Sequence, residues 1–143
     1  MLTLLAEKWP VALALACFSW GPGRVPAQTV SNGLVTVSFD RARGTLSAGF
    51  TGGGTLFDGG VSGIRFGGKV YTSDSRNYTY KVSVLPPDGS GAAMVISGSD
   101  RQKTVDFTLS VHLPPDINAV ILDVTYRNRS RSGLVAVSIE PLR

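Results

Sequence analysis

The chain has 143 residues, of which 43% are hydrophobic and 17% charged, and its mean hydropathy is +0.14. These values exclude a disordered chain and a polytopic membrane protein, and the length leaves room for one domain but not for a (β/α)₈ barrel, which needs about 250 residues. The formal net charge of +4 is too small to require a nucleic-acid partner.

Residues 1–27 differ in kind from the rest of the chain. An apolar run over 9–20 follows Lys8, and the small residues of Val25-Pro26-Ala27 then suit cleavage by a signal peptidase. About 12 apolar residues span only ~18 Å as a helix, short of the ~30 Å hydrocarbon layer, so stable membrane insertion is not expected. We predict a signal peptide over 1–27, export to the periplasm or the extracellular space, and a mature domain over 28–143.

Cys17 is the single cysteine, and it lies inside the predicted signal. Cleavage after Ala27 would leave a mature chain without cysteine, so neither disulfides nor thiol catalysis are expected there. The motif Ala14-Leu15-Ala16-Cys17 is similar to a lipobox with its Leu one place late. A lipid anchor at Cys17 is therefore the minor alternative to cleavage.

From Thr29 onward, apolar and polar residues alternate with period two, as in strands that bury one face. Turn-forming residues separate these runs at intervals of about ten residues, a spacing typical of two packed antiparallel sheets. The sequence therefore predicts an all-β, antiparallel β-sandwich of about nine short strands. In chain order the expected strands cover 34–39, 45–50, 64–66, 69–72, 78–85, 93–97, 104–113, 118–127 and 134–139.

Three pairs of these strands are expected to form hairpins, because the segment between them is rich in turn residues. The connecting segments are 40–44, which ends in Gly44, the pair Gly67-Gly68, and the proline-containing segment 114–118. Residues 104–113 are the most regular of all, and the side chains expected to face the core are Val105, Phe107, Leu109, Val111 and Leu113. The strand at 78–85 is expected to break at Pro86-Pro87.

Few residues suggest chemistry. His112 is the sole histidine, which excludes a catalytic triad or metal site built on several histidines, and its position opposite the apolar face predicts that it points to solvent. Asp106 and Asp123 lie on the polar faces of two strands, where they could form a carboxylate pair for general acid/base catalysis. Two solvated acids paired with Arg or Lys are the favoured alternative. No catalytic, cofactor-binding or metal-ligating residue is assigned.

Other polar groups have ordinary structural explanations. Gly52-Gly53-Gly54 lacks the Lys-Ser/Thr of a phosphate-binding loop, and no helix is expected after it. Turn capping accounts for six aspartates, at positions Asp40, Asp58, Asp74, Asp88, Asp100 and Asp116. A basic turn contains Arg127, Arg129 and Arg131, but no aromatic residue is interleaved there, so a solvated turn is favoured over a polyanion or nucleic-acid site.

Two features of the sequence could involve carbohydrate: glycosylation acceptor motifs and a set of tyrosines. Asn77-Tyr78-Thr79 and Asn128-Arg129-Ser130 match the glycosylation acceptor pattern, which matters only in a host that glycosylates exported proteins. Tyr71, Tyr78 and Tyr80 could stack on sugar rings, but two of them share an apolar strand face, so core packing is the favoured role.

Two segments resemble a known family. The opening Ser31-Asn32-Gly33-Leu34-Val35-Thr36-Val37-Ser38-Phe39, which runs into Gly44-Thr45-Leu46, and the closing Val120-Ile121-Leu122-Asp123-Val124-Thr125-Tyr126-Arg127-Asn128-Arg129-Ser130 are similar to the N-terminal supersandwich of α-galactosidase-like glycoside hydrolases. Similar motifs also occur in sandwiches that resemble mutarotases and α-glucosidases. In such enzymes the sandwich precedes a (β/α)₈ barrel that holds the two catalytic aspartates.

The resemblance implies a non-catalytic domain of an exported glycoside hydrolase, with carbohydrate as partner either directly or through a barrel. The chain ends at Arg143, before any barrel would begin, so none of the family's catalytic residues can be placed on it. A fragment, a truncated product and a stand-alone module all fit this expectation. The alternatives of a different class are a stand-alone carbohydrate-binding module and a surface-adhesive domain.

Overall fold

The computed structural model describes residues 27–66, 68–131, 136–140 and 142, and all regular elements in these ranges are β-strands. The predicted all-β class is therefore confirmed. Positions 1–26, including Cys17 and nearly all of the predicted signal peptide, lie outside the described residues, as do Gly67 and part of the last expected strand.

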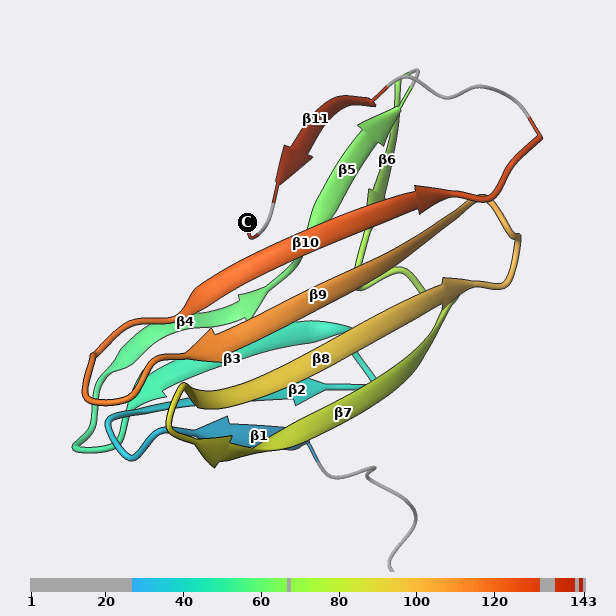
Figure 1. Cartoon of the computed structure of the whole chain (residues 1–143). Coiled ribbons are helices and arrows are strands. Elements are labelled where there is room, and N and C mark those ends of the chain that lie inside the picture. Colours follow the sequence, from blue (N-terminus) through green and yellow to red (C-terminus); the bar gives the residue numbers. More distant parts are fainter. Residues whose placement is uncertain (1–26, 67, 132–135, 141, 143) are drawn as a thin grey trace, which may run out of the picture.

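Two four-stranded antiparallel sheets form the layers of the sandwich, and a small three-stranded sheet stands at one end (Figure 1). The first sheet has the order β1 (Gln28–Ser31), β2 (Val35–Asp40), β3 (Thr45–Phe50), β4 (Thr55–Gly60). The second has the order β10 (Ile121–Asn128), β9 (Val105–Leu113), β8 (Gly91–Asp100), β7 (Tyr78–Asp88). The third has the order β11 (Ala136–Glu140), β5 (Gly63–Phe66), β6 (Lys69–Thr72).

The core lies between the two large sheets and is made by alternate residues of their strands. Every second side chain of β9, from Val105 to Leu113, is buried, as the sequence predicts. From the facing sheet, β2 and β3 contribute Val37, Phe39 and Leu46 to the same cluster. The three expected hairpins are also present, as β2–β3, β5–β6 and β9–β10.

The described residues contain eleven strands where about nine were expected, because β1 and β4 were not predicted. β4 follows a glycine-rich turn and exposes most of its side chains, so it lacks the alternation by which a strand is recognised. The prediction that the β7 strand breaks at Pro86 is wrong, since β7 continues to Asp88. Its pairing with β8 shifts register between Leu85 and Asp88, and both prolines fall in this irregular stretch of an edge strand, where no ladder N–H is needed.

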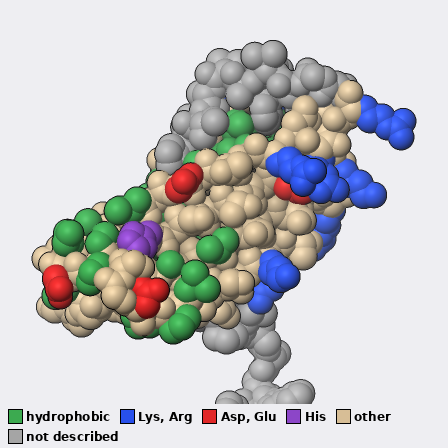
Figure 2. All heavy atoms as spheres, in the orientation of Figure 1, with side chains coloured by type: hydrophobic (Ala, Val, Ile, Leu, Met, Phe, Trp, Pro, Cys, Tyr) green, Lys and Arg blue, Asp and Glu red, His purple; other side chains and the backbone are tan. Residues whose placement is uncertain are grey.

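The outer face of the second sheet is graded from apolar to basic. Hydrophobic side chains and the histidine gather at the end where β8 and β10 begin, whereas Lys and Arg gather at the opposite end (Figure 2). The register places Leu85, Ala93, His112 and Ile121 in one row across the four strands at the apolar end. His112 lies on the outer face, as predicted, but is half-buried between neighbours in this row.

A network of buried hydroxyl groups joins the three sheets. The Ser73 hydroxyl donates to the Gly44 carbonyl in the β2–β3 turn at 2.9 Å and accepts from the Ser62 N–H at 3.0 Å. The Tyr80 hydroxyl of β7 donates to the Ser73 carbonyl, and the Ser62 and Tyr126 hydroxyls lie 2.5 Å apart. These bonds hold the small sheet against both layers of the sandwich.

Asp100 caps the turn between β8 and β9. Its side chain is 8% exposed, and its carboxylate accepts from the N–H groups of Gln102 at 2.9 Å, Thr104 at 2.8 Å and Val105 at 3.3 Å. Burial opposes ionisation and is the largest single influence, but the hydrogen bonds from Gln102, Thr104 and Val105 together outweigh it and lower the pKa of Asp100.

We expect Asp100→Ala to lower the free energy of unfolding at pH 7 by about 1–3 kcal/mol, because three backbone N–H groups, including the buried one of Val105, lose a charged acceptor. Since the pKa of Asp100 is lower in the folded than in the unfolded chain, its stabilisation is present above the unfolded pKa of about 3.9 and is lost as pH falls through the folded value. In urea unfolding, the free energy of unfolding should therefore fall less between pH 7 and pH 2 for the variant than for the unchanged chain. Asp123→Ala, at an exposed position, serves as control. An equal decrease in the free energy of unfolding with pH for Asp100→Ala and the unchanged chain would contradict the prediction.

Candidate functional site

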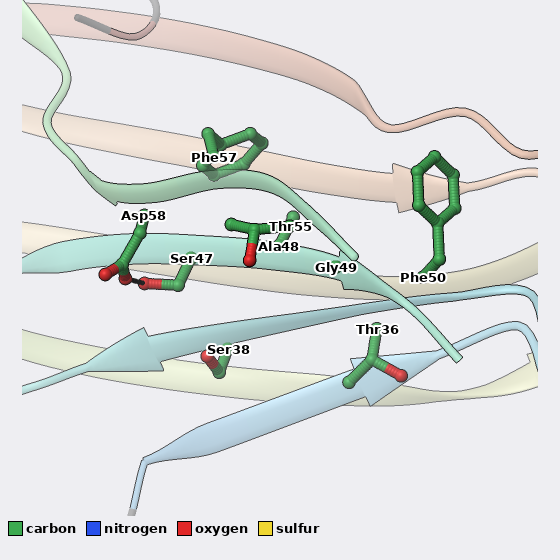
Figure 3. A pocket seen from close by; sticks show the side chains of 9 residues that line it. All are labelled: Thr36, Ser38, Ser47, Ala48, Gly49, Phe50, Thr55, Phe57 and Asp58. Carbon is green, nitrogen blue, oxygen red and sulfur yellow. Dashed lines mark hydrogen bonds between the residues drawn. The ribbon is translucent and has the colours of Figure 1, made fainter. Parts of the chain in front are cut away.

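A shallow groove of about 320 Å³ crosses the outer face of the first sheet (Figure 3). Thr36 and Ser38 alternate with the buried residues of β2, and Ser47 does the same on β3, so their hydroxyl groups face away from the core. The remaining side of the groove is formed by β4. The residues that line the groove include four with hydroxyl groups, two phenylalanines and one carboxylate: Thr36, Ser38, Ser47, Thr55, Phe50, Phe57 and Asp58.

The carboxylate of the groove is oriented by its neighbours. The Ser47 hydroxyl donates to Asp58 Oδ1 at 2.5 Å and accepts from the Gly59 N–H at 3.2 Å (Figure 3). Asp58 is nevertheless exposed, so the carboxylate can accept further hydrogen bonds from a bound molecule. The prediction that Asp58 caps a turn is wrong, because the residue lies within β4 and bonds across the sheet to β3.

The two phenylalanines that border the groove lie on the core face of the first sheet, because Phe50 is paired with the buried Val35 and Phe57 with the buried Ala48. Phe50 is 38% exposed at the end of β3, whereas Phe57 on β4 is partly buried and packs against the core. The β3–β4 pairing shifts register on both sides of Ala48. Such bulges bend a strand and redirect its side chains. The outer face of the groove therefore presents hydroxyl groups and one oriented carboxylate, which match the hydroxyl groups of a sugar.

The two strand-borne carboxylates do not form a pair. The register places Asp106 opposite Arg127 and Asp123 opposite Ser110, so four residues of β9 separate the two positions, or about 13 Å along the strand. Asp106 Oδ2 lies 3.1 Å from Arg129 Nη1, and Asp106 Oδ1 accepts from the Asp100 N–H at 2.9 Å. For Asp106, the favoured alternative of an acid paired with a basic side chain is confirmed.

The tyrosines pack in the core, as predicted. Tyr78 is buried and donates to the Val105 carbonyl at 2.9 Å, and its ring lies edge-on to that of Phe107 with centroids 5.0 Å apart. Burial, with a smaller contribution from Asp100, raises the pKa of Tyr78. The Tyr80 ring contacts Phe39 edge-on at 5.3 Å, and burial raises the pKa of Tyr80 to about 12.

Asp40 and Asp88 cap turns, as predicted. Asp40 Oδ1 accepts from the N–H groups of Ala42 at 2.8 Å and Arg43 at 3.1 Å, and Asp88 Oδ1 accepts from the Ser90 N–H at 2.8 Å. Residues 51–54 form the turn between β3 and β4, and a strand rather than a helix follows it. The groove was not predicted from the sequence. Its hydroxyl residues alternate with core residues as in any half-buried strand, and only the position of β4 beside β3 makes them part of a groove.

Comparisons with known proteins find no match: no protein-family model, no curated protein and no solved structure is similar to this chain. Within the described ranges, no group of three or more His, Cys, Asp or Glu side chains is placed to hold a metal ion. The described part of the chain also contains no helix with the length and hydrophobicity needed to cross a bilayer.

Proposed function

We propose that this chain is a non-catalytic sandwich domain of an exported, α-galactosidase-like glycoside hydrolase, and that it contacts carbohydrate through the groove on the first sheet. The observation that carries the proposal is the combination of the outward-facing hydroxyl groups of Thr36 and Ser38 with the oriented Ser47–Asp58 pair in one open groove. The engagement of Asp106 with Arg129 and with the Asp100 N–H also supports a non-catalytic role, because this carboxylate is not placed beside a second one as a retaining mechanism requires.

A stand-alone carbohydrate-binding module is the second candidate, and the groove favours it as well. The two candidates differ in what the chain does alone. A stand-alone module must bind sugar by itself with useful affinity, whereas a supporting domain completes a sugar site that belongs mainly to a neighbouring barrel. Weak binding that strengthens greatly when a barrel domain is present would favour the supporting role.

Binding of neutral galacto-oligosaccharides to the full chain, measured by calorimetry, tests the groove. We expect Asp58→Asn to weaken binding about tenfold, because hydrogen bonds from sugar hydroxyls to a charged acceptor are lost. Ser47→Ala should also weaken binding, since it removes the hydroxyl group that orients the Asp58 carboxylate. Leu56→Ala is the matched control: it removes an exposed apolar side chain of β4 that does not line the groove.

Two results would contradict this proposal. Equal binding by the unchanged chain and both groove variants would place any sugar contact elsewhere. Hydrolysis of an aryl α-galactoside by the full chain, abolished by Asp106→Asn, would make the sandwich itself catalytic, although a retaining mechanism requires two carboxyl groups about 5–5.5 Å apart.

A further inference from the structure

A second pocket lies on the opposite outer face, on the sheet formed by β7 to β10. The cross-strand register puts Ser97, Thr108 and Thr125 in one row and Asp106 opposite Arg127 in the next, while Ser99 follows Ser97 by two residues on β8. The two rows are about 7 Å apart, because two strand residues rise about 6.8 Å. These side chains line a pocket of about 240 Å³.

The pocket opens at the basic end of this face, where the blue side chains gather in Figure 2. The exposed cations that belong to this end are Lys81, Arg101, Lys103, Arg127, Arg129 and Arg131. Two carboxylates of the same sheet, Asp100 and Asp106, lie among these six cations, and Arg129 is paired with Asp106. The positive charge at this end is therefore left largely uncompensated.

Arg127 is the cation that lines the pocket itself. Its cross-strand neighbour Asp106 forms its ion pair with Arg129 instead, and within the described residues no ion pair involves Arg127. A guanidinium group is a planar fork that matches a carboxylate through two parallel hydrogen bonds. The hydroxyl groups of Ser97, Thr108 and Thr125 stand one row away, where they can both donate and accept hydrogen bonds.

We propose that this pocket binds a hexuronate residue of an acidic polysaccharide, with Arg127 on the carboxylate and the neighbouring Ser and Thr hydroxyls on the ring hydroxyl groups. The surrounding cations attract the polyanion by long-range electrostatics, and the pocket selects the sugar. The site lies on a different sheet from the groove and does not depend on it.

The composition of the pocket favours a polysaccharide over nucleic acid. Single-stranded nucleic acids are held by exposed aromatic rings on which bases stack, and the aromatic residue of this pocket, Phe107, is 2% exposed and turned into the core. An anionic membrane surface is also disfavoured, because the exposed apolar side chains of this face, Leu85 and Ile121, lie at the end away from the cations.

The test compares binding of the full chain to polygalacturonate and to neutral galactan, which differ in the carboxylate. We expect tighter binding of polygalacturonate than of galactan, which can occupy only the groove. Added salt should weaken the binding of polygalacturonate, because exposed charges are screened. Arg127→Gln should reduce the affinity about tenfold, and Thr108→Val about threefold, since one loses a charge-assisted and the other a neutral hydrogen bond. Arg43→Gln is the matched control: it removes the same charge from a 78% exposed side chain in the turn between β2 and β3, which does not line the pocket.

Several results would overturn the proposal. One is equal affinity of the Arg127→Gln and Arg43→Gln variants, with both still folded by circular dichroism. Another is tighter binding of dextran sulfate, duplex DNA or anionic lipid vesicles than of polygalacturonate, with no effect of Thr108→Val, which would mean that charge density alone is recognised.

Loss of galacto-oligosaccharide binding by Asp58→Asn, with polygalacturonate binding retained, would confirm that the two sites are separate.

Discussion

Phe107→Ala is expected to lower the free energy of unfolding by about 3–5 kcal/mol, the range found when a buried aromatic side chain is truncated. Phe107 is 2% exposed, and its ring lies 5.0 Å from that of Tyr78 and 6.1 Å from that of Tyr126, measured between centroids. It also covers Gly98 on the neighbouring strand, where an added Cβ would lie 2.1 Å from the ring. Truncation therefore removes aromatic contacts and opens a cavity that Gly98 cannot fill.

Chemical denaturation measures this loss, and Thr108→Ala is the control, because the adjacent side chain points outward and should change stability by no more than about 0.5 kcal/mol. A double-mutant cycle with Gly98→Ala adds a sharper criterion. Gly98→Ala should destabilise the unchanged chain by overpacking but recover part of the loss in Phe107→Ala, where the methyl group has space. A loss below about 1 kcal/mol for Phe107→Ala would contradict the assigned strand faces.

Gly44→Ala should destabilise the fold by about 3 kcal/mol or more, from two causes that add. The residue has a φ of +70°, which an L side chain adopts only with strain. An added Cβ would also lie 2.1 Å from the Ser73 carbonyl oxygen, next to the Tyr80 hydroxyl that donates to the same carbonyl. Because Ser73 belongs to the hydroxyl network that joins the three sheets, its displacement should weaken the contact between them.

Gly33→Ala isolates the backbone contribution to this effect. Gly33 has a φ of +89°, but an added Cβ there meets no atom within 4 Å, so its replacement should cost only about 1–2 kcal/mol. The difference between the two variants in urea denaturation is the steric part at Gly44. Equal losses would show that Ser73 and Tyr80 move aside at little cost, and would contradict the inferred rigidity of the network.

Much of the fold follows from patterns within single strands and turns. In β9, period-two alternation predicts which side chains are buried, because successive residues of an extended chain point to opposite faces whatever their partner strand. The turn from Asp40 to Gly44 is predictable for a similar reason, since a short carboxylate bonds its own backbone and a glycine accepts positive φ. The fold class therefore needed no knowledge of which strands are neighbours.

The sites, in contrast, depend on contacts between residues far apart in the chain. Alternation places Asp106 and Asp123 on polar faces, but the register of β9 against β10 separates them and brings Arg127 opposite Asp106 instead. The groove exists because β4, which shows little alternation, folds beside β3 and brings Asp58 to Ser47. Ser62 and Ser73 lie between the strands expected from the sequence, where exposed loop residues are usual, yet both are buried at the junction of three sheets. Cross-strand register and sheet packing arise from the sum of many distant contacts, so no local pattern encodes them.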